Sequence, residues 1–254
     1  TGTDEHGQKI QRTAESLGRS PQAHCDLVVP GFEALWKQLD IQYDRFIRTT
    51  SRRHEHIVKE FFQRVWNSGD IYLNEQKGWY CVSCEEFKDE RDLLPGNRCS
   101  IHTSKEVEWR DEENYFFRLS RYQDKLLALY AESPEFIAPE SRRNEVLSFV
   151  NSGLQDFSIS RVNLEWGLPI PVDPSHTIYV WFDALVGYVT ALLDPDSDPT
   201  LENATSKWWP IDLHLIGKDI LRFHAVYWPA MLISAGLPMP GRVFAHGFLT
   251  KDGK

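Results

Sequence analysis

Three cysteines and one histidine have the residue types and the spacing of a metal site. Cys81 and Cys84 form a C-x2-C pair, and Cys99 and His102 form a C-x2-H pair farther along the chain. Each pair can direct two ligands at one ion, and three thiolates with one imidazole make the closed tetrahedral shell of a structural zinc site. Two unrelated pairs of buried thiols are the alternative. The spacing favours zinc, in a small module that metal binding helps to fold.

Two aromatic stripes follow helical spacing in the second half of the chain. Trp181, Ala184, Leu185 and Tyr188 recur at i, i+3, i+4 and i+7 and therefore share one helical face. A second stripe, with residues four apart and one aromatic beside them, consists of Ile220, His224, Trp228 and Phe223. If the two faces oppose each other, they form an apolar pocket with a hydroxyl and an imidazole as its few polar groups, which suits a slender apolar ligand. Core packing is the alternative, and periodicity alone favours it.

Two polar turns could meet a polar ligand. Gly217 ends a strand-like run, where glycine lets the backbone approach a ligand, and the Asp219 carboxylate could accept hydrogen bonds from a ribose. The alternative for Asp219 is a helix N-cap. Asp4, followed by Glu5 and His6, lies at the exit of the first strand. A carboxylate there could pair with a ligand ammonium group, or the segment could be an ordinary polar turn.

The remaining cysteine and histidines carry no pattern of this kind. Cys25 stands alone on a predicted helix, which favours a packed free thiol. His54 and the other histidines are assigned to surface or core. The basic stretch around Arg48 and Arg52 is expected to be a solvated helix start.

Hydrophobic periodicity and turn residues predict the elements that hold these side chains. Helices are expected over 8–18, from Ser20-Pro21 to about Leu39 with a break or kink at Pro30, and over 51–67, 121–131 and 141–151. Short strand-like pieces and tight turns between 70 and 118 indicate an inserted module. Strands at 177–181, 213–216 and 242–249 alternate with helices at 183–193 and 218–235, and 194–210 is expected to be a surface loop. This alternation predicts a parallel α/β sheet, which binds ligands at the carboxyl ends of its strands.

Composition narrows the class of protein. The chain has 254 residues, of which 41% are hydrophobic and 26% charged, as is usual for globular proteins. No apolar run reaches the ~18–20 residues of a transmembrane helix. The net charge of −9 argues against a chain whose main task is to coat nucleic acid, since phosphate binding needs a positive field.

Ordered motifs along nearly the whole chain closely resemble the methionyl-tRNA synthetase family of class I aminoacyl-tRNA synthetases. Besides the Cys3His module, they are Thr1-Gly2-Thr3-Asp4-Glu5-His6-Gly7, Ser158-Ile159-Ser160-Arg161, Tyr179-Val180-Trp181-Phe182-Asp183-Ala184, His214-Leu215-Ile216-Gly217-Lys218-Asp219 and Trp228-Pro229-Ala230-Met231-Leu232. The resemblance implies an α/β fold with a Rossmann-like parallel sheet, interrupted by a small zinc-binding connective insertion. The implied segments are 1–69 and 119–254 for the catalytic domain and 70–118 for the insertion.

The resemblance also implies a reaction. Methionine and ATP would give methionyl adenylate and pyrophosphate, and the acyl group would then pass to the terminal adenosine of tRNA(Met). Asp4 would help hold the methionine ammonium, and the Tyr188 hydroxyl would address the sulfur. The methionine side chain would be surrounded by Trp181, Ala184, Leu185, Tyr188, Ile220, Phe223, His224 and Trp228, with Leu185 standing where some members have proline. On the ATP side, Gly217 and Asp219 would meet the ribose, and Leu249 would border adenine with His246 and Gly247 nearby.

Two phosphate-handling motifs of the resembled family are absent from the chain. The His-Ile-Gly-His motif is expected before Thr1, and the Lys-Met-Ser-Lys-Ser loop is expected at or just after Lys254. We therefore expect an internal fragment that is inactive alone, and we assign no catalytic residue to it. We expect structural zinc as a cofactor and magnesium together with ATP. We expect a cytoplasmic location, although an organellar form stays open, and no membrane or DNA partner. A zinc-ribbon binding module on an α/β scaffold, without adenylation, is the alternative function.

Overall fold

The structure, a computed structural model, describes residues 1–162, 164–248 and 250. The chain forms two compact units, each built from three segments. Unit 1 comprises Thr1–Lys59, Leu73–Phe116 and Ser158–Ala191, and unit 2 comprises Glu60–Tyr72, Phe117–Phe157 and Leu192–Lys254. The linear division into 1–69, 70–118 and 119–254 stays a prediction.

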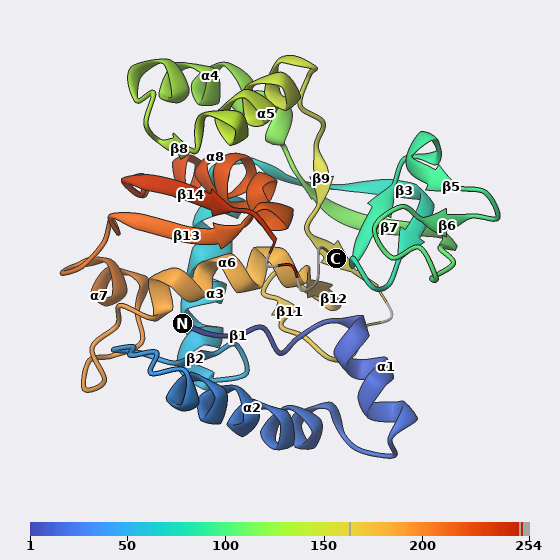
Figure 1. The fold of residues 1–254 in the computed structure, drawn as a ribbon, viewed down its shortest axis with the longest axis horizontal. Helices are drawn as coiled ribbons and strands as arrows, with labels where there is room; N and C mark the ends of the chain where they lie inside the picture. The colour runs from blue at the N-terminus through green and yellow to red at the C-terminus, as the bar shows by residue number, and fades with distance from the viewer. Residues whose placement is uncertain (163, 249, 251–254) are drawn as a thin grey trace. The chain divides into compact units, whose positions relative to one another are not determined.

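Unit 1 begins with a parallel β-α-β connection (Figure 1). Strand β1 (Gly2–Thr3) pairs in parallel with β2 (Ile47–Arg48), and helices α1 (Gln8–Ser16) and α2 (Pro21–Gln38) connect them. Ser20 caps α2 by accepting a hydrogen bond from the N–H of Ala23, as Ser20-Pro21 predicts. Of the predicted break or kink at Pro30, the break is wrong, because α2 is one helix through that residue. The proline ring lies on the exposed side, and burial of Cys25 and Val29 holds the helix together around the missing backbone hydrogen bond.

The segment between 70 and 118 is a β-module, as predicted, but two of its strands are long. Its main sheet has the order β4-β3-β7-β9, in which β9 comes from outside the segment, and β5 and β6 form a separate antiparallel pair (Figure 1). The elements are β3 (Ile71–Cys81), β4 (Glu86–Lys88), the 3-10 turn Glu90–Asp92, β5 (Leu93–Leu94), β6 (Arg98–Cys99), β7 (Glu108–Phe117) and β9 (Phe157–Ser158).

The strand predicted over 177–181 does not join the parallel sheet. The observed strand β12 (Asp173–Ile178) pairs antiparallel with both β10 (Ser160–Arg161) and β11 (Pro169–Ile170). The reason is local, since β11 reverses into β12 through a turn at Pro171 and Val172. Helix α6 (Val180–Thr190) therefore starts three residues before the predicted helix, directly after Tyr179.

Unit 2 contains the predicted parallel sheet. Its strand order is β13-β14-β8, formed by Leu213–Gly217, Arg242–His246 and Ile137–Ala138, all parallel. Leu215 and Phe244 are register partners, and so are Gly217 and His246 at the carboxyl ends. The sheet lies beside α5 and α8 (Figure 1), and the α/β fold with a parallel sheet is confirmed. The helices of the unit are α4 (Gln123–Glu132), α5 (Glu140–Asn151), α7 (Leu201–Thr205), α8 (Trp228–Ala235) and the end of α3 (Arg52–Asn67).

Two further predictions for unit 2 need correction. The helix over 218–235 is not a uniform α-helix, because it starts with a 3-10 turn at Lys218–Ile220 and contains a π-helical turn at Phe223–Tyr227. The expected surface loop over 194–210 contains α7, which is capped by Thr200 and buries Leu201 and Ala204. These two apolar side chains anchor the segment despite its Asp-, Pro- and Ser-rich flanks.

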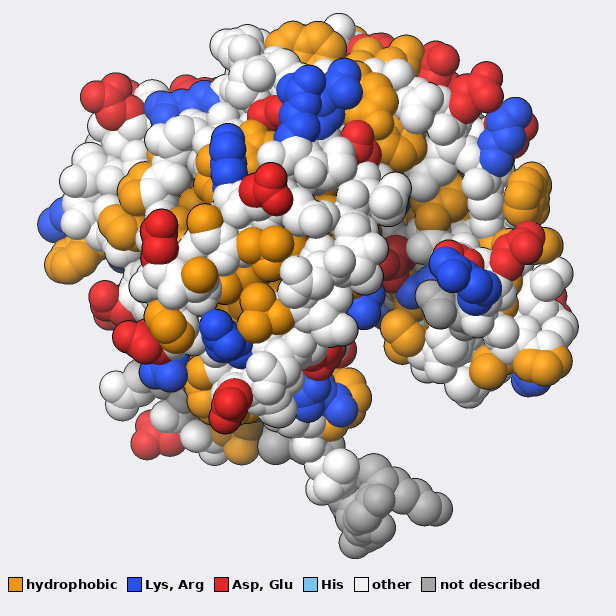
Figure 2. Space-filling view, turned by 90° about the horizontal axis from the view of Figure 1, so that it is seen from above, with side chains coloured by type: hydrophobic (Ala, Val, Ile, Leu, Met, Phe, Trp, Pro, Cys, Tyr) orange, Lys and Arg blue, Asp and Glu red, His pale blue; other side chains and the backbone are white. Residues whose placement is uncertain are grey.

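Among the described residues, no helix combines the length and the apolarity that a membrane crossing requires. Figure 2 shows acidic and basic side chains interspersed on the face it presents, in keeping with the net charge of −9.

Candidate functional site

The predicted metal ligands come together in unit 1. The ligand atoms of Cys81, Cys84, Cys99 and His102 all lie within 4.8 Å of one another. The Sγ of Cys84 is 3.6 Å from the Sγ of Cys99 and 3.2 Å from Nδ1 of His102. Cys81 and Cys99 are fully buried against Val107. Three thiols and one imidazole at these distances match the donor set and the size of a closed tetrahedral metal shell.

The surroundings of Cys99 and His102 favour the protonation states that metal binding needs, whereas burial raises the pKa of the Cys84 thiol. Burial opposes a charge on Cys99, but hydrogen bonds from the backbone N–H groups of His102 and Ile101 outweigh it and lower the pKa of the thiol. Partial burial and the positive charge of nearby Lys9 lower the pKa of His102, which keeps its imidazole neutral. A thiolate and a neutral imidazole are the forms that bind a metal.

A second cluster in unit 1 surrounds a buried carboxylate that the sequence reasoning missed. Asp183 on α6 is 1% exposed and accepts hydrogen bonds from Nδ1 of His6 and Nε2 of His54, both at 2.7 Å. The other ring nitrogen of His54 lies 2.9 Å from the hydroxyl of Thr190. Burial alone would raise the pKa of Asp183, but the two imidazoles hold it below its usual value. His54, assigned to surface or core, is a fully buried core residue, but its hydrogen-bond partners were not predicted, and only the Asp in the 179–184 motif hinted at one.

Asp4 lies next to this cluster. Its side chain is accessible to solvent, yet the dense protein around its carboxyl group disfavours the charged form. This desolvation, reinforced by the negative charge of Asp183, raises the pKa of Asp4 to about 6, although His54 and His6 oppose the shift. Burial, and to a smaller extent the charge of Asp4, raises the pKa of Tyr188 well above its usual range. Asp4 and Tyr188 thus share one electrostatic environment, as expected of two groups in one site.

The first aromatic stripe lies on α6 as predicted. Trp181, Ala184 and Tyr188 are half-buried, whereas Leu185 is 2% exposed and belongs to the hidden side of the helix. Three of the four residues therefore keep a surface that a ligand could touch. Their role in binding methionine stays a prediction.

The second stripe lies in unit 2 and is more deeply packed. His224 and Trp228 are fully buried, whereas Ile220 and Phe223 are half-buried. The ring of Trp228 packs against that of Phe61, with 5.5 Å between the ring centroids. Nδ1 of His224 donates to the carbonyl of Ile220 at 3.0 Å, and burial lowers the pKa of His224 to about 4. The imidazole is thus neutral, while the predicted opposition of this stripe to Tyr188 of unit 1 stays a prediction.

The residues predicted to meet ATP gather at the carboxyl ends of β13 and β14. Gly217 and His246 are register partners there, and Gly247 follows His246. The carboxylate of Asp219 folds back toward Gly217, where a Cβ would lie only 2.5 Å from Oδ1 of Asp219. A side chain at this position would require the exposed Asp219 carboxylate to move, and Asp219 does not act as a side-chain cap of this turn. Leu249 lies outside the described residues.

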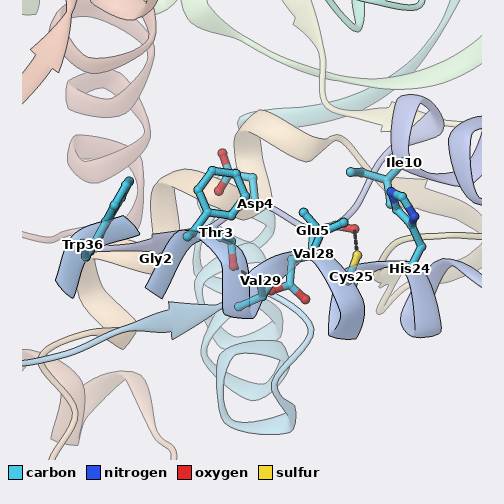
Figure 3. Close-up of a pocket in the computed structure, with 11 residues that line it drawn as sticks. Gly2, Thr3, Asp4, Glu5, Ile10, His24, Cys25, Val28, Val29 and Trp36 are labelled. Atoms are coloured by element: carbon cyan, nitrogen blue, oxygen red, sulfur yellow. Dashed lines mark hydrogen bonds between the residues drawn. The ribbon is translucent and has the colours of Figure 1, made fainter. Parts of the chain in front are cut away.

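A hollow of about 380 Å³ in unit 1 was not predicted from the sequence. It lies between the exit of β1 and α2, with Asp4 at its border (Figure 3). Apolar side chains of α2, among them Val28 and Phe32, line it, and both of these are about two-fifths exposed.

Comparison with known proteins identifies the family. The family model described as tRNA synthetases class I (M) matches residues 1–96 and 90–254. The chain belongs to this family. Among its class I (M) relatives, the methionine–tRNA ligase of Nostoc sp. is 74% identical over all of this chain and 48% of its own length. The chloroplastic/mitochondrial methionine–tRNA ligase of Arabidopsis thaliana is 58% identical over all of this chain and 41% of its own length.

Solved structures of the class I (M) family agree with the fold. The methionyl-tRNA synthetase of Mycobacterium tuberculosis, in complex with methionyl-adenylate, superposes with a TM-score of 0.90 at 49% identity. The match covers 97% of this chain and 48% of that protein. The chain thus spans about half the length of the class I (M) relatives it matches.

Proposed function

We propose that the whole protein to which this chain belongs is a methionine–tRNA ligase. The carboxylate of methionine attacks the α-phosphorus of ATP, which gives methionyl adenylate and releases pyrophosphate. A ribose hydroxyl of the terminal adenosine of tRNA(Met) then attacks the acyl carbon, which transfers the acyl group and releases AMP. The observation that carries the proposal is the 74% identity to the Nostoc ligase over the full chain. The likeness to a synthetase solved with methionyl-adenylate supports it.

In this proposal, unit 1 supplies the recognition of the methionine amino group and sulfur. Asp4 pairs with the ammonium, because it is a solvent-accessible carboxylate in a site that otherwise disfavours charge. Tyr188 directs its hydroxyl at the sulfur from the half-buried face of α6, with Trp181 and Ala184 beside it. Methionine and leucine are close in size, so a hydroxyl that meets only the sulfur adds the discrimination that an apolar slot lacks.

Unit 2 supplies the nucleotide side of the proposed site. Gly217 lets the backbone approach the ribose, and the exposed Asp219 carboxylate accepts its hydroxyls. Ligands of parallel sheets bind at the carboxyl ends of the strands, where these residues lie. Ile220, Phe223, His224 and Trp228 of this unit stay candidates for contacts with the methionine side chain, and magnesium accompanies ATP.

Zinc is proposed for the Cys3His cluster. All four positions of a tetrahedral shell are taken by side chains, so the ion would hold the module together and leave no position for substrate. The cytoplasm is the proposed location, with tRNA(Met) as the macromolecular partner.

Methionine-dependent exchange of pyrophosphate into ATP by the whole protein tests the proposed function. Tyr188→Phe should reduce the preference for methionine over its sulfur-free analogues about fivefold, the weight of one hydrogen bond, while the KM for ATP stays unchanged. Tyr43→Phe, which alters an exposed tyrosine, is the matched control. Absence of exchange in the wild type would favour the zinc-ribbon binding module, and equal losses for methionine and its analogues would leave Tyr188 with a packing role only.

A further inference from the structure

Glu85 connects the metal cluster to the first helix. It follows Cys84 directly, and its Oε1 accepts a hydrogen bond from the N–H of Lys9 at 2.9 Å. The backbone of Gln8 also donates to this carboxylate. Helix α1 has no side-chain cap of its own, because Gly7 occupies the N-cap position. A carboxylate from the metal module therefore caps α1, at the end where a helix favours negative charge.

The fit between Glu85 and the turn before α1 is close. Gly7 has a φ of +108°, and a Cβ at this position would lie 2.4 Å from Oε1 of Glu85. Its N–H donates to the carbonyl of Trp166 at 3.1 Å. Gly7 is thus held from two sides, and the segment that it ends carries Asp4 and His6.

The backbone of Glu85 is fixed as well. Its φ of +55° is in the left-handed region, which a residue other than glycine occupies only when its surroundings hold it there. The carbonyl of Glu85 accepts a hydrogen bond from the buried guanidinium of Arg161 at 3.5 Å. Glu85 as a whole is only 9% exposed. Cys84 holds the preceding peptide in the metal cluster.

We propose that Glu85 is a positioning residue for methionine binding, through which the metal centre fixes the start of α1 and with it the carboxylate of Asp4. The path runs from the metal through Cys84 to Glu85, then to the N–H groups of α1, and through Gly7 back to Asp4. The inference rests on the proposed function, because it takes Asp4 as the partner of the methionine ammonium.

The test uses the whole protein loaded with zinc and measures the methionine Kd, the zinc content and amide hydrogen exchange at residues 8–10. Glu85→Ala should weaken methionine binding about tenfold and speed exchange at residues 8–10, with the zinc content unchanged. Glu85→Gln keeps an amide oxygen as acceptor and should recover part of both losses. Glu90→Ala, an exposed glutamate of the same module, is the control and should match the wild type.

Metal removal supplies the decisive comparison. A chelator should weaken methionine binding by the wild type about as much as Glu85→Ala does, and should weaken binding by Glu85→Ala little further, because both changes cut the same path. Unchanged binding in Glu85→Ala, additive losses, or loss of zinc from that variant would each overturn the inference. Wild-type protein that binds no methionine at all would instead contradict the proposed function. Asp4→Asn, which should weaken binding strongly without affecting exchange at residues 8–10, separates the two failures.

Discussion

At the scale of single residues, Asp183 is a buried carboxylate that connects distant segments of unit 1. It is the shared acceptor of two buried imidazoles, those of His6 and His54. Asp183→Ala should lower the free energy of unfolding by about 1–3 kcal/mol for each imidazole left without its partner. Urea denaturation measures this, with Asp196→Ala in an exposed loop as the control. Equal stability of both variants would contradict the prediction.

The pH dependence of that contribution has a defined sign. The folded-state pKa of Asp183 is lowered, so its stabilisation is present above about pH 4, the usual pKa of an aspartate, and is lost as the pH falls below it. The difference in stability between wild type and Asp183→Ala should therefore shrink in acid. Denaturation curves recorded at several pH values check this.

The raised pKa of Asp4 predicts a second pH effect, which concerns methionine binding. Its pKa of about 6 means that its carboxylate is charged above that pH and protonated below it. Methionine affinity of the whole protein should be constant above pH 6 and fall by about tenfold per pH unit below it, as one proton displaces the ammonium partner. Equilibrium dialysis across this range measures the slope. Asp4→Asn should bind weakly and without the pH dependence, and a slope that survives this substitution would assign the effect to another group.

At the scale of elements, the β5–β6 hairpin depends on the metal cluster. The buried core beside it is small, consisting of Cys81, Cys99 and Val107 with partly buried Trp79, Cys84 and Leu93. We predict about one zinc per chain by elemental analysis, a lower content in Cys84→Ser, and unchanged content in Cys25→Ser, whose thiol is buried on α2. A chelator should expose the hairpin to proteolysis, because metal binding supplies folding free energy that so small a core lacks. Full resistance without metal would contradict this.

At the scale of the whole molecule, the chain spans 48% of the Nostoc relative. It contains neither a His-Ile-Gly-His nor a Lys-Met-Ser-Lys-Ser motif, and its net charge is −9. Stabilising the transferring phosphates needs positioned donors and positive charge, and the resemblance assigns this task to the two absent motifs. The isolated chain should therefore show no methionine-dependent pyrophosphate exchange, whereas the whole protein should. Exchange by the isolated chain at the rate of the whole protein would refute this.

The sequence alone determined the features that depend on local spacing. The four metal ligands lie in two short knuckles, so their types and intervals were enough to group them. Helix α2 begins where Ser20 and Pro21 predict, and the order of the motifs indicated the family that the comparison confirmed. The cap of α2 and each pair of metal ligands involve residues a few positions apart, which spacing and capping rules describe directly.

Only the tertiary structure decided which distant segments meet. The site around Asp183 joins α6 to His6 of the first segment and to His54 of α3, and the cap of α1 comes from Glu85 in the metal module. The strand predicted over 177–181 was expected in the parallel sheet, yet the observed β12 pairs antiparallel with β10 and β11. Local spacing specifies which face of an element is apolar or polar, but not its partner. The partner is selected by the packing and hydrogen bonding of the whole chain.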